Sequence, residues 1–194
     1  MSEFRELLRG YSDWLPEITE AGIGLLEVHY LKLLSWMPKM NLTSITSHRE
    51  IVLRHYVECA WFAGLLPEGR VIADCGSGAG FPGVPMAAVR PHSEVVLIEA
   101  DHRKGVFLRE STLGFPNVSV EVGRLERARS RPQGVLARGV DVVAVRAFGE
   151  AHAEWVAVLT SAEIAAKFKW DMQKRLLWDE NHVAAFFKVP RETP

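Results

Sequence analysis

The sequence predicts an α/β fold, in which a mostly parallel sheet carries helices on both faces and a helical extension at its N-terminus. Up to about residue 66 apolar residues recur at helical spacing, and from residue 70 short runs rich in valine and isoleucine alternate with helix-length segments. Continuous apolar strands separated by helices are typical of a parallel sheet, because both faces of such a sheet are buried.

Length and composition fit one folded domain. The chain has 194 residues, of which 48% are hydrophobic and 24% charged, close to the averages for globular proteins. These values argue against wholesale disorder and against a fibrous repeat. We expect a single domain overall, with residues 1–66 as a helical extension packed on a core formed by residues 67–194.

Cysteine, histidine and charge patterns exclude several classes of protein. Cys59 and Cys75 have no CxxC spacing and the seven histidines are scattered, so we expect neither a disulfide framework nor a metal site. The chain has no basic leader followed by an apolar stretch and no run of 18 apolar residues, which favours the cytoplasm and no membrane partner. The net charge of −1 means that a nucleic acid would have to be attracted by a local basic patch.

The individual elements follow in chain order. Helical spacing begins with Leu7, Leu8 and Tyr11, Pro38 is expected to end a helix, and residues 41–44 supply turn and capping residues before a helical run over residues 49–66. Strands are predicted at residues 71–73, 95–98, 118–122 and 140–145, and helices near residues 83–90, 102–113 and 150–160. Towards the C-terminus, residues 164–170 and 183–189 look strand-like, and residues 171–177 are ambiguous.

The strongest local signal is a glycine-rich loop after the first predicted strand. Asp74 ends the strand, three glycines follow at 76, 78 and 80, and Pro82, Gly83 and Pro85 open a helix. Glycine permits positive φ and lets a ligand approach the backbone, while proline is favoured in the first turn of a helix. The loop therefore predicts a site for a nucleotide-like ligand, against the simpler interpretation of a tight turn between strand and helix.

The acidic residues on either side of the loop bear on which ligand it holds. The glycines fit both a GxGxG and a dinucleotide-type GxGxxG spacing, so spacing does not decide. Glu99, at the end of the next strand, stands where it can accept hydrogen bonds from ribose hydroxyls, as both nicotinamide enzymes and methyltransferases require. Asp74 favours the methyltransferase, because an anion there suits the cationic amino end of S-adenosylmethionine and opposes a pyrophosphate.

From Trp36 to Phe148 the sequence resembles the 16S ribosomal RNA guanine-N7 methyltransferases, the small-subunit methyltransferase G or glucose-inhibited division protein B family. The most specific part is the FPGxP extension of the loop together with the upstream Asn41-Leu42-Thr43. The residues that carry the resemblance are Trp36, Lys39, residues 41–45, Arg54, His55, residues 74–85, Glu99, Arg103, Lys104, residues 107–109, Asn117, Val118, residues 123–126 and residues 145–148.

The resemblance implies a class I S-adenosylmethionine-dependent methyltransferase fold and methylation of N7 of one guanine in 16S ribosomal RNA. The implied cofactor is S-adenosyl-L-methionine, and the implied partner is the RNA, the 30S subunit or an assembly intermediate. We expect a monomer. The cofactor site expected from the loop and the resemblance together comprises Asp74, Gly76, Gly78, Gly80, Phe81, Glu99, Leu125, Glu126 and Arg146. Residues expected to contact RNA are Asn41, Arg54, His55, Arg103, Lys104 and Arg124.

Two departures from the family pattern concern the substrate more than the cofactor. An Asp-Ser pair is usual a few residues after the Arg-His, and this chain has Glu58-Cys59 there. The usual Pro-Gly-Gly turn before the fifth strand is also missing, and residues 158–163 occupy its place.

Several side chains have two interpretations. Arginines at 124, 127, 129, 131 and 138 form a basic segment that suits phosphate contact, although a solvated helix face is the simpler alternative. Residues that could add to this segment are Lys39, Arg49, Arg54, Arg103, Lys104 and Arg109. An arginine directly after an apolar strand is costly to bury unpaired, so Arg146 is expected in the site, against the alternative of a structural ion pair. His55 is either an RNA contact or a packed residue. The tryptophans 155, 170 and 178 are expected in the core, and Phe81 is expected to contact the ligand.

The implied reaction needs no catalytic acid or base, because guanine N7 carries a free lone pair and catalysis by positioning suffices. Two other functions stay open on the sequence. One is a nicotinamide-dependent oxidoreductase, which Asp74 and the lack of a hydride-transfer arrangement disfavour. The other is a non-catalytic RNA-binding or assembly protein that retains the fold, suggested by the altered C-terminal region.

Overall fold

The computed structural model describes residues 1–67, 69, 71–124, 127–129, 132–138, 145, 149, 152–176 and 179–189. Its centre is a seven-stranded sheet with the strand order β3-β2-β1-β4-β5-β7-β6. The strands are β1 (Val71–Cys75), β2 (Glu94–Glu99), β3 (Val118–Val122), β4 (Gly134–Arg138), β5 (Trp155–Ser161), β6 (Met172–Leu176) and β7 (Asp179–Lys188).

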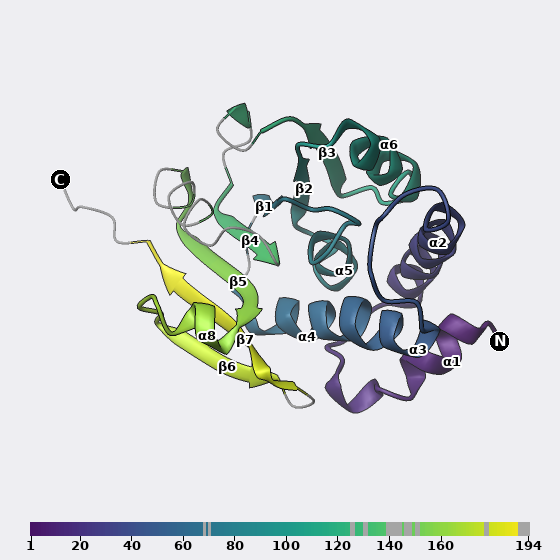
Figure 1. Cartoon of the computed structure of the whole chain (residues 1–194), viewed down its shortest axis with the longest axis horizontal. Helices are drawn as coiled ribbons and strands as arrows, with labels where there is room; N and C mark the ends of the chain where they lie inside the picture. Colours follow the sequence, from purple (N-terminus) through teal and green to yellow (C-terminus); the bar gives the residue numbers. More distant parts are fainter. Residues whose placement is uncertain are drawn as a thin grey trace.

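The sheet is parallel from β3 to β5, and β7 runs antiparallel to both β5 and β6. The strand order reverses between β1 and β4, which are neighbouring strands in the middle of the sheet (Figure 1). In open α/β sheets ligands bind outside the carboxyl ends of the strands at such a reversal point. The glycine loop begins at the carboxyl end of β1, next to this point.

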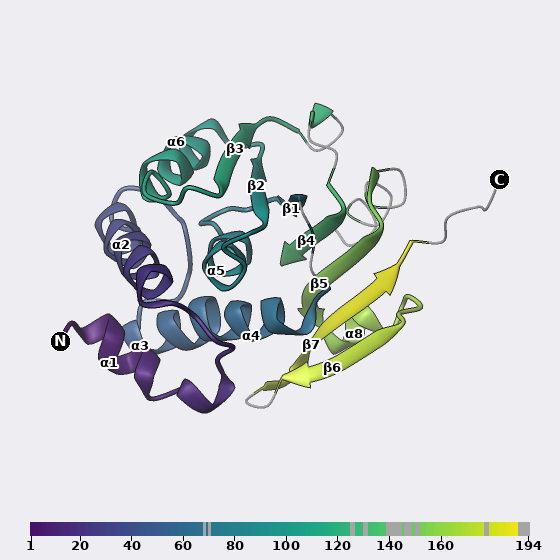
Figure 2. The same cartoon turned by 180° about the vertical axis from the view of Figure 1, so that it is seen from behind.

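Most described helices pack against one face of the sheet. They are α1 (Glu3–Arg9), a 3-10 helix (Ser12–Trp14), α2 (Glu20–Trp36), α3 (His48–Ile51), a π-helix (Val52–Val57), α4 (Glu58–Leu65), α5 (Gly83–Val89) and α6 (His102–Ser111). Figure 2 shows α1 to α4 running along this side of the molecule. Residues 41–44, which the sequence predicts to supply turn and capping residues, lie between α2 and α3.

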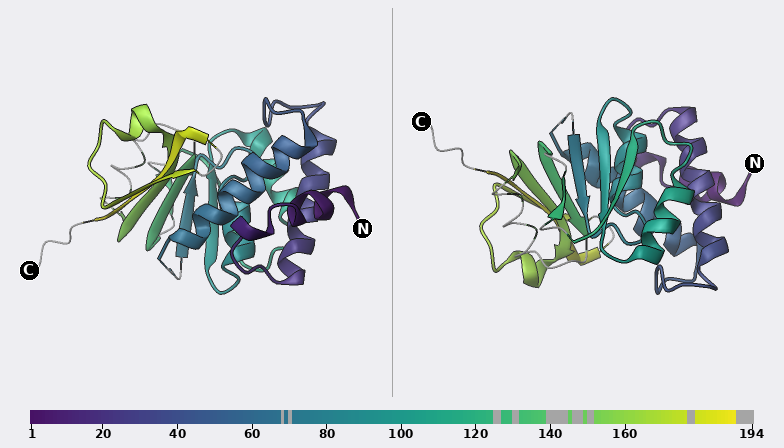
Figure 3. Two further views of the ribbon diagram at one scale, coloured as in Figure 1. Left: turned by 90° about the horizontal axis from the view of Figure 1, so that it is seen from below. Right: turned by 90° about the horizontal axis from the view of Figure 1, so that it is seen from above.

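The sheet separates two apolar clusters. The larger one joins Phe4 and Leu26 of the N-terminal helices to Ile72, Leu97 and Leu136 of the sheet. The smaller one covers the opposite face, where α8 (Ala162–Ala165) contacts β5 and β7. There Trp170 donates its indole N–H to the carbonyl of Ala165. Helices therefore cover both faces of the sheet. Both views of Figure 3 place α8 and the N-terminal helices at opposite ends of the molecule.

The positions of six predicted elements are confirmed closely. They are the strands β1, β2, β3 and β7 and the helices α5 and α6. The predicted helix near residues 150–160 is wrong, because Trp155–Ser161 is β5. Trp155 and Ala157 of this strand join the larger cluster, and Val156 and Val158 join the smaller one. A segment buried on both sides has no polar face, so its continuous apolar run indicates an internal parallel strand.

One further strand prediction is wrong. Residues 164–170 are not a strand, since α8 covers Ala162–Ala165 and a turn follows. The fourth strand occupies Gly134–Arg138, earlier than the predicted residues 140–145, of which Val145 is helical and the others lie outside the described residues. The ambiguous residues 171–177 contain β6. In the sheet β4 pairs with β1 and β5, and β6 pairs with β7, the next strand along the chain.

Cys59 and Cys75 are free and buried, so neither forms a disulfide. Trp155 is buried in the core as predicted, and Trp170 packs against Phe187; Trp178 lies outside the described residues. Across the described ranges, no helix combines the length and the apolar character needed to cross a bilayer.

Candidate functional site

The glycine loop is anchored to the sheet through its backbone. The N–H groups of Gly76 and Ser77 both donate to the carbonyl of Ile98 at the end of β2, at 2.8 and 3.1 Å. Gly76, Gly78 and Gly80 have φ values of 73°, 57° and 91°. Side chains other than glycine rarely adopt this left-handed region, so all three glycines are required by the path of the loop.

The glycines differ in what a side chain would meet. A Cβ at Gly80 would stand 2.7 Å from Val84 Cγ2, and a Cβ at Gly83 would collide with Leu97 and come within 2.7 Å of Asp74 Oδ2. A Cβ at Gly78 would meet nothing nearer than the Gly76 carbonyl at 3.9 Å. Gly80 and Gly83 therefore serve the packing of the loop, while the backbone of Gly78 borders open space where a ligand can approach.

Asp74 lies beneath the loop and not on its surface. Its side chain is fully buried, and Oδ2 accepts a hydrogen bond from the Gly83 N–H at 2.9 Å. Oδ1 has no hydrogen-bond partner within the described ranges. Burial raises the pKa of Asp74 to about 7, although the Gly83 N–H opposes the shift. The carboxyl is thus held in a place where its charge is poorly compensated.

Glu99 stands at the carboxyl end of β2, facing the loop. Its Oε2 accepts a hydrogen bond from the Gly78 N–H and its Oε1 accepts one from the Asp101 N–H, both at 2.8 Å. A carboxylate has about four lone-pair positions, so two backbone bonds leave acceptor capacity on this side chain. The residue is 8% exposed and its orientation is fixed by both neighbours.

Phe81 packs inward from the loop, contrary to the expected ligand contact. Its ring is 6% exposed, stacks on His55 at a centroid distance of 4.7 Å and meets His29 and Tyr56 edge-on. His29 is fully buried below the loop, and burial lowers its pKa to about 3. The aromatic group therefore ties the loop to the N-terminal helices, because an apolar ring gains most from full burial.

His55 is one member of a partly buried chain of polar side chains. Arg138 Nη1 lies 2.9 Å from His55 Nδ1, and Thr43 Oγ1 lies 2.8 Å from His55 Nε2. Because a guanidinium only donates, Nδ1 must accept, and the neutral ring then carries its proton on Nε2 and donates to Thr43. Burial, followed by the positive charge of Arg138, lowers the pKa of His55 to about 3. The packed interpretation of His55 fits these contacts.

The same chain continues to Glu58. Arg138 Nη2 lies 2.9 Å from Glu58 Oε1, and Arg138 Nη1 lies 3.6 Å from Cys59 Sγ. Glu58 is 3% exposed, and a carboxylate buried to this extent needs compensation, to which Arg138 contributes. The Glu58-Cys59 pair that departs from the family pattern is therefore matched by Arg138. His55 comes from the π-helix, a conformation frequent at functional sites.

The sequence analysis placed Arg138 among the arginines suited to phosphate contact and did not predict its pairing with His55 and Glu58. Arg138 ends β4, the position that the sequence analysis gave to Arg146, and it does not join the other basic residues on the surface. The available signal was the apolar run Val135-Leu136-Ala137 directly before it. Arg146, Leu125, Glu126 and Arg131 lie outside the described residues.

The remaining expected RNA contacts lie in different surroundings. Arg54 pairs with Asp179 of β7 at 2.7 Å, and Arg103 donates to the Lys39 carbonyl at 3.2 Å. The backbone N–H of Lys104 is capped by Asp101 at the start of α6. Asn41 and Arg124 are exposed. The side chains of Arg54 and Arg103 are therefore engaged within the protein, whereas Asn41 and Arg124 are exposed to solvent.

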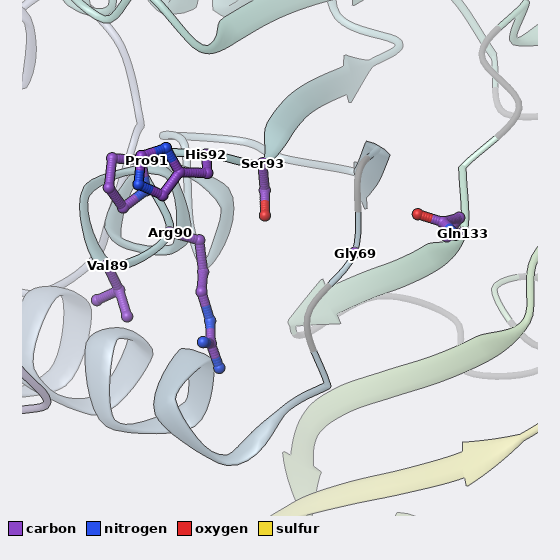
Figure 4. Close-up of a pocket in the computed structure, with 7 residues that line it drawn as sticks. All are labelled: Gly69, Val89, Arg90, Pro91, His92, Ser93 and Gln133. Atoms are coloured by element: carbon purple, nitrogen blue, oxygen red, sulfur yellow. The ribbon is translucent and has the colours of Figure 1, made fainter.

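Hollows lie at both ends of the sheet. A cavity of about 370 Å³ borders Gly69, Arg90, His92, Ser93 and Gln133 at the amino ends of β1, β2 and β4 (Figure 4). A second, larger groove, about 860 Å³, follows the carboxyl half of β3 and reaches Ile98 within β2 and Ala100 after it. Only the second is on the side of the glycine loop, so the cavity in Figure 4 is set apart from this site.

Comparison with known proteins agrees with the resemblance of the loop. Residues 24–166 match the family described as GidB, rRNA small subunit methyltransferase G. The ribosomal RNA small subunit methyltransferase G of Chromobacterium violaceum is 33% identical over 147 residues, which are 75% of this chain and 68% of that protein. Its namesake in Nitrosomonas europaea is 38% identical over 126 residues, 62% of this chain and 55% of that protein.

The fold has relatives among solved structures. The 23S rRNA methyltransferase ErmE is 17% identical, with a TM-score of 0.54, over 71% of this chain and 68% of that one. This likeness supports the class I, Rossmann-like methyltransferase fold. The chain spans from just over half to about two thirds of the length of the two curated relatives. Since the family match covers most of the chain, including the loop, Glu99 and β4, the protein belongs to the rRNA small subunit methyltransferase G family.

Proposed function

We propose that this chain binds S-adenosylmethionine over the glycine loop and transfers its methyl group to N7 of a guanine in 16S ribosomal RNA. The observation that carries the proposal is the placement of the open Gly78 backbone beside Glu99, at the carboxyl ends of β1 and β2. Ligands of open α/β sheets bind at this edge. The family to which the chain belongs supports the type of reaction.

The residues at the loop fit the chemical groups of the cofactor. The unused lone pairs of Glu99 suit the two ribose hydroxyls, and the space beside Gly78 admits a ligand without a Cβ in the way. Gly76 and Gly80 contribute by adopting the positive φ values that the path of the loop requires. Leu125 and Glu126 for the adenine, and Arg146, remain proposals that rest on the resemblance alone.

Asp74 contributes the negative charge of the site. Its Oδ1 lacks a partner in the described part of the chain, and burial holds the pKa of the carboxyl near 7. A cation close to the loop would favour the ionised form. We propose that Asp74 supports the cationic amino end of the cofactor from below, through the loop, since its burial leaves no surface of its own.

Methyl transfer to guanine N7 places few demands on side chains. When bound, S-adenosylmethionine supplies an electrophilic methyl group, and the nucleophile N7 has no proton to lose. The chain has to hold the base and the loop in line, and orientation of this kind contributes several kcal/mol, up to about 7–11 kcal/mol in well-aligned systems. The Thr43-His55-Arg138-Glu58 chain fixes residues 41–45 against the loop, as this positioning requires.

The finer partner assignments are part of the proposal. We propose that the substrate is 16S ribosomal RNA in the 30S subunit or in an assembly intermediate, that the protein is a monomer, and that it acts in the cytoplasm. We also propose that residues 1–66 and 67–194 form a single domain. Support for this comes from the apolar cluster that joins Phe4 to Phe186.

Calorimetric titration with S-adenosylmethionine and with NAD tests the cofactor. We expect saturable binding of S-adenosylmethionine and none of NAD, and the absence of S-adenosylmethionine binding at millimolar concentration would refute the proposal. Gly78→Val should abolish binding without unfolding the chain, because it puts a branched side chain at φ 57° on the open side of the loop. Gly24→Ala is the matched control, since its Cβ would meet only Arg5 Nη2 at 3.7 Å.

Incubation with 30S subunits, with naked 16S RNA and with labelled cofactor tests the substrate. We expect the label on N7 of a guanine in the RNA, and comparison of the two forms identifies the preferred state of the substrate. Label on protein or small molecules in place of RNA would exclude ribosomal RNA methylation. Cofactor binding without any transfer would instead favour a non-catalytic RNA-binding protein.

A further inference from the structure

Four arginines converge on the groove of about 860 Å³ beside β3. Arg109 comes from α6, and Arg124, Arg127 and Arg129 come from the segment that follows β3. We call this feature the arginine groove. The wall between them consists of residues 120–123 and Ile98 and Ala100. All four arginine side chains are exposed, and β3 is an edge strand of the sheet, so the groove is accessible.

No described side chain pairs with the guanidinium groups of three of these arginines, Arg109, Arg124 and Arg127. Other arginines are held by acidic partners: Arg5 binds two glutamates, and Arg54 binds Asp179. The groove therefore brings together three arginines that have no acidic partner among the described residues, in a protein with a net charge of −1.

The acidic residue in the groove does not neutralise it. Glu121 Oε2 accepts a hydrogen bond from the backbone N–H of Arg129 at 2.9 Å. That bond attaches Arg129 to the edge strand β3, in which Glu121 lies. Among the described residues that line the groove, one is acidic and four are arginines, so positively charged side chains outnumber negatively charged ones.

The groove leads to the candidate cofactor site. Gly123 in its wall donates its backbone N–H to the carbonyl of Glu99 at 2.9 Å, and Ala100 in the same wall follows Glu99 directly. Glu99 in turn holds Gly78 of the glycine loop. A chain-like ligand in the groove would therefore pass close to the place where the methyl group is proposed to be transferred.

We propose that the arginine groove binds the phosphate backbone of the substrate RNA and guides the strand towards the glycine loop. The inference rests on the proposed function and adds a binding surface to it. Arginine matches phosphate oxygens through two parallel N–H donors, and arginines on two sides of an open groove suit a polyanion of repeated phosphates. An acidic protein would also be attracted by charge, but it lacks this regular geometry.

The test is a triple variant, Arg109→Gln with Arg124→Gln and Arg127→Gln. Its matched control is Lys167→Gln with Lys169→Gln and Arg175→Gln, which removes the same charge near α8 and β6, at the opposite edge of the sheet. The probe is a short hairpin RNA with an unpaired guanine in its loop, titrated at several salt concentrations. The same proteins are titrated with S-adenosylmethionine and with polyglutamate, and their thermal unfolding is recorded.

We expect the triple variant to bind the hairpin at least about tenfold more weakly at 0.1 M salt, with a salt slope smaller by about 2 to 3, since each lost phosphate contact removes roughly 0.7–0.9. S-adenosylmethionine binding and the unfolding temperature should stay unchanged, and the control should bind RNA like the wild type. Equal losses in triple variant and control, unchanged RNA binding, or equally tight polyglutamate binding would overturn the inference.

Two further results separate this inference from the proposed function. If the triple variant loses S-adenosylmethionine binding as strongly as RNA binding, the groove belongs to the cofactor pocket and the inference is wrong. If the wild type binds RNA through the arginines but never binds S-adenosylmethionine, the proposed methyl transfer fails while the groove stands.

Discussion

Arginines in two regions of this molecule face opposite situations. At the end of β4, Arg138 is largely buried and is held by Glu58 and His55. Along β3, Arg109, Arg124 and Arg127 are exposed and have no partner among the described side chains. A buried charge must be paired to be tolerated, whereas an exposed one keeps its hydration and stays available for a ligand. The same residue type therefore serves the interior of the site in one place and its outer surface in the other.

The contrast predicts that changes near β4 act on stability and that changes near β3 act on binding. The partly buried chain from Glu58 to Thr43 links the loop before α3, the π-helix and the end of β4. Loss of one of its contacts should therefore lower the free energy of unfolding. The arginine groove contacts solvent, so its loss should leave the fold intact. The following changes test this division.

The largest effect is expected from Arg138→Met. It leaves Glu58, which is 3% exposed, without the pair described here, and breaking a buried pair in this way costs about 3–5 kcal/mol. Chemical denaturation should report the lower free energy of unfolding. The double variant Glu58→Gln with Arg138→Met should recover part of the loss. A single variant as stable as the wild type would contradict the importance of the pair.

Asp74→Asn should raise the free energy of unfolding at pH 8, by about 2–4 kcal/mol, because about 1.4 kcal/mol corresponds to each pKa unit. Burial raises the pKa of Asp74 to about 7 in the folded protein, from the ordinary carboxyl value of 3.8 that applies in the unfolded chain. Between these values the unfolded chain gives up the proton first, so the wild type loses stability as pH rises from about 4 to 7.

Denaturation of wild type and Asp74→Asn at pH 4 and at pH 8 checks this sign. The difference between the two proteins should be small at pH 4 and largest at pH 8. A constant difference would show that Asp74 does not titrate with a raised pKa. The same variant should weaken S-adenosylmethionine binding, since it removes the charge beneath the loop.

His55→Ala should destabilise by about 1–3 kcal/mol, the cost of leaving a buried polar group without its partner. It removes the acceptor for Arg138, the donor for Thr43 and the ring stacked on Phe81. His55→Gln keeps an amide that can both accept and donate, so it should recover part of the stability. Equal losses in both variants would assign the effect to the aromatic stack.

The smallest effect on stability is expected from Arg127→Gln. Substitutions on the surface away from special features usually stay within about 0.5 kcal/mol. Thermal unfolding should therefore match the wild type, while the salt slope of RNA binding falls by about 0.7–0.9. A destabilisation of the size expected for Arg138→Met would remove the distinction between the two regions.

Much of the site could be predicted because its determinants are local. The glycines at 76, 78 and 80 are required by positive φ within a few residues, and β1, β2 and β3 follow from short apolar runs. The segment after β3 was harder, because Gly134–Arg138 and residues 140–145 are both apolar runs ending near an arginine. Pairing of β4 with β1 and β5 chose the first of them, and periodicity contains no such information.

By itself the sequence determined the alternation of strands and helices, the glycine loop with Glu99 after it, and the family. Only the tertiary structure decided that Asp74 is buried, that Phe81 packs inward, that Arg138 contacts His55, 83 positions away in the sequence, and that Arg109 of α6 and Arg124 line the same groove. The physical reason is that backbone conformation depends on near neighbours, whereas pairing and burial of charge depend on groups that only folding brings together.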